Sequence, residues 1–580
     1  MKTHMGISAQ APWLKYYGNS PAHLDYPRQT IYQIVRESAH RFPGDIAYEF
    51  MNKQTTYAQF MQRIDRVARA LVALGIKKGD RVTICMPNSP QALDTFYALN
   101  RIGAVSNMIH PLSAPAEIAF YLNFSHSKAI LTLDQFYPKL DEIRGQLKEP
   151  VKIIIAFIKD ELPMPLKQLY PLTKDARKVP KLPKGGDYIL WKDFLRAGDK
   201  IKELPPDDVM LSREGASILY SGGTTGTTKG ILLSSDNFNA TALQTIAASG
   251  VDLRYVRGMK MLSVMPVFHG FGLGIGIHTA LVGGGTCLLV PRFSLDTYAK
   301  LLVKKKPNFI PGVPTLFEAL LRTPLLENAD LSFLVGMFSG GDSLSIELKK
   351  KVDDFLRAHN AKIQIREGYG TTECVTASCL TPKDYARSGS IGVPFPDTYY
   401  KIVKVGTEDE VDPNIEGEIC ISGPSVMMCY IDNPEETAQT LRRHADGRIW
   451  LHTGDLGTMD NDGFVYFRQR IKRMIITSGY NVYPSQLENI IDGHEKVLLS
   501  CVVGVKDKYK MQKVKAYVVL RPGFEANDET RNELMAYCRK RIAKYAMPYE
   551  IEFRDELPKT LVGKVAYRIL EEEANAEAEA

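Results

Sequence analysis

The chain has 580 residues, of which 44% are hydrophobic and 24% charged, so it exceeds a single hydrophobic core and at least two domains are expected. Its net charge of +7 is spread along the sequence, which argues against a nucleic-acid-binding protein, and its eight cysteines form no CxxC pair, which argues against a zinc ribbon or a disulfide framework. We find no signal peptide and no run near the roughly 18 apolar residues of a membrane span, so a cytoplasmic protein is expected.

In chain order, the first predicted region is an α/β layer arrangement. From Thr30 to Ser113, helical apolar patterns alternate with short β-branched runs such as Arg81 to Met86. The segment from Val151 to Lys200 is rich in proline and lysine, and we interpret it as a surface excursion of the first domain. Either it is a solvated loop, or its basic residues contact anionic lipid headgroups at the inner face of the membrane. The α/β pattern resumes at Ala216 and continues to about Phe467.

Beyond Ile471 the pattern changes to that of a small α+β unit. Strands are predicted at Cys501 to Val505 and Val514 to Leu520, and a helix at Asp528 to Ala546. The last ten residues, Glu571 to Ala580, are glutamate and alanine apart from one asparagine, and we expect a solvated helix end without a chemical role.

The most distinctive local feature is SGGTTGTTKG, Ser221 to Gly230, between a predicted strand at Ala216 to Tyr220 and an apolar run at Ile231 to Leu233. Glycines allow backbone N–H groups to turn toward an anion, hydroxyls add donors and a lysine adds charge. The residues concerned are Ser221, Gly222, Gly223, Thr224, Thr225, Gly226, Thr227, Thr228 and Lys229. Because a threonine precedes the lysine and a strand follows, this is not a Walker loop. A flexible hairpin turn is the alternative, but it explains two glycines rather than this whole set.

Six further motifs follow in order along the chain. They are FHGFG (268–272), FSGGDSL (338–344), GYGTTE (368–373), HTGDLG (452–457), RQRIKRMIITSGYNVYP (468–484) and PKTLVGK (558–564). Together they resemble the adenylate-forming superfamily of acyl-CoA synthetases, firefly-type luciferases and peptide-synthetase adenylation domains, over essentially the whole chain. The resemblance implies an α/β fold with a large N-terminal adenylation domain built of subdomains (1–469), a hinge (470–474), a small mobile C-terminal α+β domain (475–570) and an acidic tail (571–580).

The resemblance also implies roles for individual residues in joining a carboxylate to ATP. Lys564 would bridge the acyl carboxylate and the α-phosphate, where it stabilises charge that develops in the transition state. Glu373 would bind Mg²⁺, with hydroxyl contacts from Thr371 or Thr372. The nucleotide would contact Gly340, Gly341, Asp342, Tyr369, Gly370, Asp455 and Arg470, with Tyr369 stacked on adenine and Asp455 on the ribose. His269 would flank the acyl carboxylate, although a lone histidine is also a common core residue.

The hinge and the acceptor site follow from the same resemblance. Lys472 falls at the hinge position, and Gly479 and Tyr480 would lie beside the pantetheine of coenzyme A after the small domain rotates. Some positions depart from the family pattern. Gln469 replaces a glycine, Arg473 an acidic residue, Gly222 a serine and Thr228 a proline, and Asp342 stands where a small residue is usual.

The acid is predicted from two weaker features. The leader PWLKYYG with LDYPRQTIYQI and the basic excursion from Val151 both resemble segments of bacterial long-chain fatty acyl-CoA ligases, but neither is a pocket. In the predicted pocket wall, Gly270 to Leu281, we interpret Gly272, Gly274 and Gly276 as leaving room for a long or bulky acyl group. We therefore expect a monomeric or homodimeric ligase of a medium- or long-chain fatty acid with ATP, Mg²⁺ and CoA. The alternatives are a ligase of aromatic or alicyclic acids, an acyl-AMP ligase that loads a carrier protein, and an inactive nucleotide sensor.

Overall fold

The computed structural model of the chain describes residues 6–173, 176–177, 179–221, 228–251, 256–477, 480–507, 509–560 and 565–579. Over these residues the large domain contains three sheets. In spatial order the first consists of β19 (Cys429–Tyr430), β9 (Lys229–Ser234), β8 (Gly215–Ser221), β4 (Val105–Met108), β3 (Arg81–Cys85), β5 (Ala129–Leu133), β6 (Lys152–Ala156) and β7 (Ile189–Leu190). Its strands are parallel except at the β19–β9–β8 edge, where they are antiparallel.

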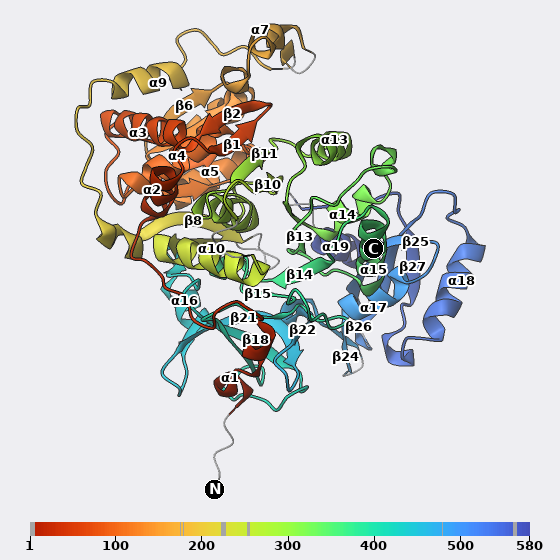
Figure 1. Cartoon of the computed structure of the whole chain (residues 1–580). Helices are drawn as coiled ribbons and strands as arrows, with labels where there is room; N and C mark the ends of the chain where they lie inside the picture. Colours follow the sequence, from red (N-terminus) through yellow and green to blue (C-terminus); the bar gives the residue numbers. More distant parts are fainter. Residues whose placement is uncertain are drawn as a thin grey trace.

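The second sheet lies across a helical layer from the first (Figure 1). In spatial order its strands are β16 (Val393–Pro394), β15 (Cys379–Leu380), β14 (Ile365–Tyr369), β13 (Gly336–Ser339), β12 (Phe309–Gly312), β10 (Lys260–Ser263), β11 (Thr286–Leu289), β1 (Ile46–Phe50) and β2 (Lys53–Thr56). Helices α13 (Leu295–Lys305), α14 (Pro314–Leu320) and α15 (Ile346–Ala358) connect its strands on one side. The predicted α/β layering is thus confirmed.

The core between the two sheets is formed by α2 (Ile31–Arg41), α3 (Tyr57–Ala73), α4 (Pro90–Arg101) and α10 (Ser235–Ser249). One buried cluster contains Ile84 of the first sheet, Tyr48 of the second and Leu71 of α3. Helix α3 begins where it does because the Thr56 hydroxyl accepts the Gln59 N–H while the Gln59 side chain accepts the Thr56 N–H. The apolar face that follows at helical spacing is then buried against both sheets.

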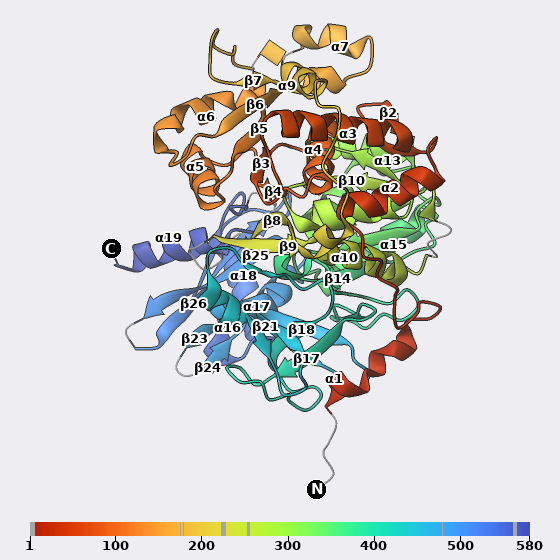
Figure 2. The same cartoon turned by 90° about the vertical axis from the view of Figure 1, so that its left-hand side faces the viewer.

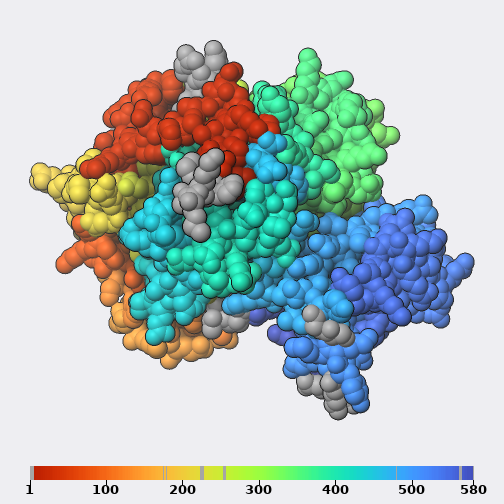
Figure 3. All heavy atoms as spheres, turned by 90° about the horizontal axis from the view of Figure 1, so that it is seen from below, coloured from red at the N-terminus to blue at the C-terminus, as the bar shows by residue number. Residues whose placement is uncertain are grey.

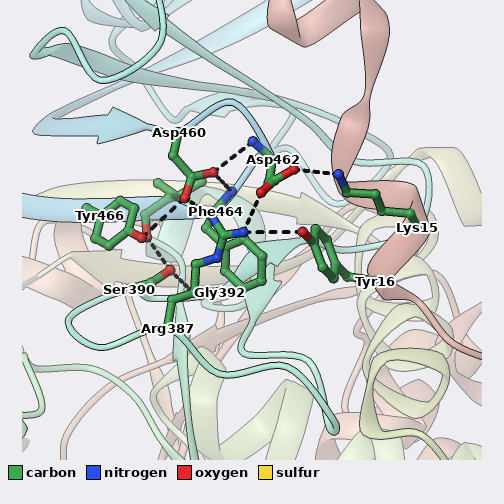
Figure 4. Close-up of polar contacts among 10 residues, drawn as sticks. Lys15, Tyr16, Arg387, Ser390, Gly392, Asp460, Asp462, Phe464 and Tyr466 are labelled. Atoms are coloured by element: carbon green, nitrogen blue, oxygen red, sulfur yellow. Dashed lines mark hydrogen bonds and ion pairs between the residues drawn. The ribbon is translucent and has the colours of Figure 1, made fainter.

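The third sheet is antiparallel and holds the end of the large domain. It consists of β17 (Tyr399–Val403), β18 (Gly417–Ser422), β21 (Ile449–Met459) and β20 (Leu441–Arg443), with β22 (Val465–Arg470) paired to β21. The N-terminal segment, with α1 (Ile7–Gln10) and η1 (Pro12–Tyr16), is fastened to this sheet by the network in Figure 4. The Arg387 guanidinium pairs with Asp460 and Asp462 in the β21–β22 turn and donates to the Tyr16 hydroxyl (3.2 Å), while Lys15 pairs with Asp462.

The C-terminal residues form a separate lobe beside the third sheet (Figures 2 and 3). Its elements are β23 (Ile475–Thr477), β24 (Tyr480–Val482), α17 (Pro484–Asp492), β25 (Val497–Asp507), β26 (Met511–Leu520), α18 (Asp528–Arg539), β27 (Glu550–Phe553) and α19 (Tyr567–Glu579). The chain leaves the third sheet at Arg470, passes through η10 (Ile471–Arg473) and enters this lobe at Ile475. The two predicted strands are confirmed, but the predicted helix from Asp528 ends at Arg539, seven residues early.

Two other sequence interpretations need correction. The segment from Val151 to Lys200 is not wholly an excursion, because its ends form β6 and β7 of the first sheet. The helical end of the chain is not simply solvated. Leu570 and Ala574 of α19 are buried against β25 and β26, and Lys515 of β26 is 2.9 Å from Glu577. The apolar positions among the glutamates were too few to reveal this packing by pattern alone.

Candidate functional site

The predicted phosphate loop joins two antiparallel strands, as expected, because β8 ends at Ser221 and β9 begins at Lys229, and these two residues pair. Gly222, Gly223, Thr224, Thr225 and Gly226 lie outside the described residues. At the loop's end the Lys229 ammonium pairs with the carboxylate of Glu436 in α16 (Pro434–Thr440) and lies 4.8 Å from the centre of the Tyr430 ring. The charge that the sequence assigned to this loop is therefore held in place at its base.

Tyr430 connects this lysine to the predicted metal ligand. Its ring lies under Lys229, and its hydroxyl donates to Glu373 Oε1 at 2.7 Å. Burial, together with the Glu373 charge, raises the pKa of Tyr430, so the phenol stays protonated and remains a donor. Sequence reasoning missed Tyr430 because it lies in β19, far along the chain from β9, with which it pairs.

A wide bulge in β21 presents Asp455. Cys420 of β18 pairs with His452 and Glu418 pairs with Leu456, so three residues of β21, Thr453 to Asp455, face one residue of β18. Because of this register shift, Asp455, whose side chain is only 2% exposed, has no partner in β18 but still pairs with Arg470 of β22.

Asp455 meets two other predicted residues there. Its Oδ2 accepts a hydrogen bond from the Tyr369 hydroxyl at 2.6 Å, and its Oδ1 lies 3.3 Å from Arg470 Nε. The charge of Asp455 raises the pKa of Arg470 against the effect of burial. Burial and the same carboxylate raise the pKa of Tyr369 well above its ordinary value. A hydrogen bond and an ion pair thus join the predicted trio Tyr369, Asp455 and Arg470 into one group.

A pocket of about 820 Å³, open to solvent, unites much of the predicted site. Its polar part is lined by His269, Gly340, Gly341, Gly370, Thr371, Thr372 and Arg470, all predicted from motifs. Its apolar part is lined by Met261, Phe271, Ile275, Phe338, Ala377, Leu380 and Phe395. Of these, Phe271 and Ile275 lie in the predicted pocket wall, whereas Met261, Ala377, Leu380 and Phe395 lie outside every quoted motif. Since apolar and polar linings are continuous, one ligand can combine a hydrophobic group with a polar or charged end.

The glycines of the predicted pocket wall have a different role from the one expected. They lie in η7 (Phe271–His278), a π-helical turn whose Phe271 and Ile275 line the pocket, whereas none of the three glycines does. A Cβ on Gly272 would lie 2.1 Å from the Pro266 carbonyl oxygen, and one on Gly274 would lie 2.8 Å from a Val375 methyl. These two positions allow close packing, so the interpretation that they make room for the acyl group is wrong.

His269 faces the pocket in a defined tautomer. Its Nδ1 accepts the Phe271 N–H at 3.2 Å, so in the neutral ring the proton is on Nε2. An Nε2–H donor on a residue that lines the pocket suits an anionic group.

Other predicted residues lie away from the pocket lining. Asp342 is exposed. Among the described residues, its side chain accepts a hydrogen bond only from the neighbouring Ser343 N–H. Lys472 is exposed within η10. Tyr480 is 56% exposed and stacks on Tyr545 with ring centres 4.6 Å apart. Gly479 and Lys564 lie outside the described residues.

Arg473 and Gln469, which depart from the family pattern at the predicted hinge, both have defined contacts in the structure. Arg473 forms a partly buried, bidentate ion pair with Glu488 of α17, and its guanidinium lies 4.7 Å from the centre of the Tyr567 ring. Gln469 is buried in β22 opposite Leu456. Arg473 therefore ties the hinge to the C-terminal lobe through an attraction that an acidic residue could not make with Glu488.

Fold and pocket together define an enzyme of the adenylate-forming class. The model of the AMP-binding enzyme family matches residues 35–431, and that of the AMP-binding enzyme C-terminal domain matches residues 486–564. The chain therefore belongs to the AMP-binding enzyme family, which confirms the resemblance seen in its motifs.

Relatives match over nearly the whole length. A long-chain-fatty-acid–CoA ligase of Bacillus subtilis (strain 168) is 36% identical over 573 residues, which are 98% of this chain and 99% of the relative. Another, of Yersinia pestis, is 33% identical over 97% of this chain and 98% of the relative. The crystal structure of the anthranilate CoA ligase AuaEII with anthranoyl-AMP superposes with a TM-score of 0.81 over 97% of this chain and all of that one. At 22% identity this last likeness concerns the fold alone.

Proposed function

We propose that this protein is an ATP-dependent ligase that converts a medium- or long-chain fatty acid to its CoA thioester through an acyl-AMP intermediate. The observation that carries the proposal is the continuity of the pocket. An apolar chain in the lining formed by Phe271, Ile275 and Phe338 would leave its carboxylate at His269, next to the polar lining of Gly340 and Thr371. The long-chain-fatty-acid–CoA ligase relatives support the same substrate class.

In the first half-reaction, a carboxylate oxygen of the acid attacks the α-phosphorus of ATP, and the bond to the β-phosphate oxygen breaks to release pyrophosphate. Because both reactants are anionic, the site must neutralise charge and hold an in-line geometry. The His269 Nε2–H donates to the acyl carboxylate, and Asp455 and Arg470 hold the ribose and phosphate. Lys564 bridges the carboxylate and the α-phosphate, where it stabilises the developing charge.

The residues around Glu373 fit a Mg²⁺ ion on the nucleotide phosphates. One Glu373 oxygen accepts the Tyr430 hydroxyl, and the other accepts no hydrogen bond from the described part of the chain, so a hard cation can bind to it. Thr371 and Thr372, which directly precede Glu373 in the chain, line the pocket. When bound, the ion would supply charge neutralisation, while Tyr430 keeps the carboxylate oriented.

In the second half-reaction, the thiol sulfur of CoA attacks the acyl carbon, and the bond to the phosphate oxygen breaks to release AMP. We infer that residues 470–474 act as the hinge between a large domain (1–469) and a small domain (475–570), with Gly479 and Tyr480 beside the pantetheine. Two described contacts lie next to the PKTLVGK motif. Val565 bridges to Lys559, and the Tyr567 ring lies on Arg473 at the hinge.

Product analysis tests the reaction class. The protein is incubated with ATP, Mg²⁺ and CoA and a panel of fatty, aromatic and alicyclic acids, and release of AMP and acyl-CoA is measured. We expect AMP with fatty acids, whereas ADP as the product would refute the mechanism. Discharge of the adenylate by a carrier protein but not by CoA would favour the carrier-loading alternative. In Lys564→Ala, adenylation should collapse while thioester formation from supplied acyl-AMP largely survives, and equal loss in both half-reactions would contradict the assigned role.

We further infer that α7 (Leu166–Leu169) and its flanks contact anionic membrane lipid. This segment lies at one extremity of the molecule (Figure 1), and four large apolar side chains within nine residues are exposed: Met164 (62%), Leu166 (43%), Leu169 (49%) and Leu172 (68%). Exposed Lys167, Lys181 and Lys184 supply complementary charge. None of the helices in the described part of the chain has the length and hydropathy to cross a bilayer.

Sedimentation with vesicles tests this contact. Binding to vesicles that contain phosphatidylglycerol should exceed binding to neutral phosphatidylcholine vesicles, and Leu169→Glu with Leu172→Glu should abolish it. Ile346→Glu serves as the control, because Ile346 is an exposed residue of α15, a helix of the second sheet, whereas α7 follows a strand of the first sheet. Equal binding of the double variant and the native protein would refute the assignment.

A further inference from the structure

A chain of buried polar groups lies behind the Asp455 bulge, on the third sheet. Lys401 of β17, Glu418 and Cys420 of β18 and His452 of β21 have neighbouring positions, since Lys401 pairs with Cys420 and Cys420 with His452. All four are buried, as is His444, which follows β20. The sequence analysis assigned none of these side chains a role. Because burying polar groups costs free energy unless they are paired, their hydrogen bonds need to be accounted for in full.

The hydrogen bonds have one consistent direction. Glu418 Oε2 lies 3.0 Å from His452 Nδ1, and a carboxylate accepts, so the His452 proton is on Nδ1. His452 Nε2 is then an acceptor, and His444 Nε2, 3.0 Å away, must donate to it. His444 Nδ1 is therefore also an acceptor, and it faces the Lys401 ammonium at 3.4 Å. When both imidazoles are neutral, each hydrogen bond from Lys401 through His444 and His452 to Glu418 joins one donor to one acceptor.

The far end of this chain holds the bulge. The second Glu418 oxygen, Oε1, accepts the Gly454 N–H at 3.0 Å, one residue before Asp455. Gly454 has a φ of +70°, a conformation that side chains disfavour, and the bulge has no ladder partner there. The Thr453 hydroxyl supports the same turn, since it donates to the Ile419 carbonyl (2.7 Å) and accepts the Asp455 N–H (3.1 Å). Glu418 thus connects the imidazole pair to the backbone that aims Asp455.

We propose that Glu418, His452 and His444 are positioning residues for the nucleotide, and that their directional hydrogen-bond chain, begun by Lys401, holds the Asp455 carboxylate in the orientation that binds the ribose. The inference rests on the proposed function in one respect, namely that Asp455 contacts ATP. A positioning role predicts a change in ATP affinity, with the affinity for the acid and the turnover rate nearly unchanged.

The same groups could be considered as a metal site, because ligand atoms of Glu418, Cys420 and His452 lie within 4.8 Å of one another. Two observations favour the hydrogen-bond chain instead. His452 Nδ1, the nitrogen that faces the carboxylate, is already matched as a donor, and the Lys401 ammonium in the same buried group would repel a cation.

The fixed donor-to-acceptor order makes this chain of hydrogen bonds sensitive to pH. Protonation of His444 places an N–H donor at Nδ1 opposite the Lys401 ammonium. Burial and the Lys401 charge lower the pKa of His444, so the chain is intact at neutral pH and breaks as the pH falls below the ordinary histidine value of about 6.5. Burial alone would raise the pKa of Glu418, but its bonds from His452 and Gly454 lower it, so the carboxylate remains charged. The other charged or titratable groups that act on this cluster are Lys401, Glu408, Cys420, Arg442 and Asp446.

The experiment measures KM for ATP, KM for the acid and kcat. It compares a substitution that should disrupt the hydrogen bonds with a second substitution that should partly restore them. Glu418→Gln retains a single acceptor oxygen. With that oxygen on the Gly454 N–H, the amide N–H₂ faces His452 Nδ1, which favours the opposite tautomer of both imidazoles and brings His444 Nδ1–H against Lys401. We expect about a tenfold higher KM for ATP, as for a lost hydrogen bond to a charged group. Adding Lys401→Met should restore ATP affinity several-fold, since His444 Nδ1–H can then donate toward Asp446. The matched control is Glu435→Gln, an exposed position on α16.

Additive losses in the Glu418→Gln and Lys401→Met double variant would overturn the directional chain, because independent structural defects add. A second variant, His444→Phe, keeps a planar ring and never touches the bulge, so it should raise KM for ATP and flatten its rise below pH 6.5. An unchanged pH profile in His444→Phe, or one zinc per chain in the purified protein, would also overturn the proposal. Failure of the proposed function is distinguishable, because ATP binding can be titrated calorimetrically without turnover.

Discussion

Replacing Tyr430 by phenylalanine removes a single hydroxyl group next to Lys229, at the end of the predicted phosphate loop. The ring that lies 4.8 Å from Lys229 stays, so the cation–π contact and the packing are retained, and only the hydroxyl that donates to Glu373 at 2.7 Å is removed. Tyr430 is buried, and water has little access to replace the lost donor. The Glu373 carboxylate then loses the one hydrogen bond that orients it among the described residues.

The magnitude follows from the type of bond. A hydrogen bond to a charged group contributes about 1.5–3 kcal/mol, and 1.36 kcal/mol corresponds to a factor of ten. We take the lower value because Glu373 is only partly buried and solvent screens part of the interaction. KM for Mg²⁺–ATP should therefore rise about tenfold in Tyr430→Phe, while KM for the fatty acid changes less than twofold.

Steady-state kinetics at saturating acid and CoA, with ATP and Mg²⁺ varied separately, provide the assay. Tyr17→Phe is the control, since it removes a comparable half-buried hydroxyl that donates to the Pro394 carbonyl (2.8 Å). A KM for Mg²⁺–ATP within twofold of the native value would refute the reasoning, because Glu373 would then keep its orientation without Tyr430. Equal rises in Tyr17→Phe and Tyr430→Phe would point instead to a general loss of structure.

Arg473→Met removes the ion-pair partner of the partly buried Glu488 carboxylate, so hydrogen exchange should show the small lobe opening at about 2 kcal/mol lower free energy, and unchanged exchange there would contradict the anchoring role. Burial lowers the pKa of His278 to about 3, so below pH 6.5 the unfolded state binds a proton that the folded state does not. The free energy of unfolding should therefore fall by about 1.4 kcal/mol per pH unit as the pH drops from 6.5 toward 3. In chemical denaturation His278→Asn should lose this slope and exposed His40→Asn should keep it, and identical slopes would exclude His278. Gly274→Ala should cost about 1–3 kcal/mol by overpacking, whereas Gly276→Ala, which meets only a carbonyl oxygen at 3.5 Å, should be neutral in the same measurement.

Much of the site follows from local sequence, because the residues that bind a nucleotide are grouped in short loops. The strand-to-strand setting of Ser221 and Lys229 was predictable, since hydrophobic alternation on both sides of a glycine-rich loop specifies a hairpin. Likewise Gly340 and Gly370 line the pocket as their motifs indicate. Tyr369, Asp455 and Arg470, drawn from three motifs, meet in one group.

Residues that act by pairing between distant elements could not be predicted in this way. Tyr430 carries no motif, and its role depends on the pairing of β19 with β9 some 200 residues earlier. The glycines of η7 were assigned to the pocket because composition does not tell which side of a helix faces a cavity. Arg473 was noted only as a departure, and its partner Glu488 became visible once α17 packed on the hinge.

By itself the sequence determined the α/β class, the order of the nucleotide motifs and the chemistry expected of them, because these depend on periodicity and on residues adjacent in the chain. Only the tertiary structure decided which apolar side chains close the pocket, how Glu373 is held and how His444, His452 and Glu418 align behind Asp455. Those relations depend on strand register and helix packing, in which a shift of one residue would turn each side chain to the opposite face.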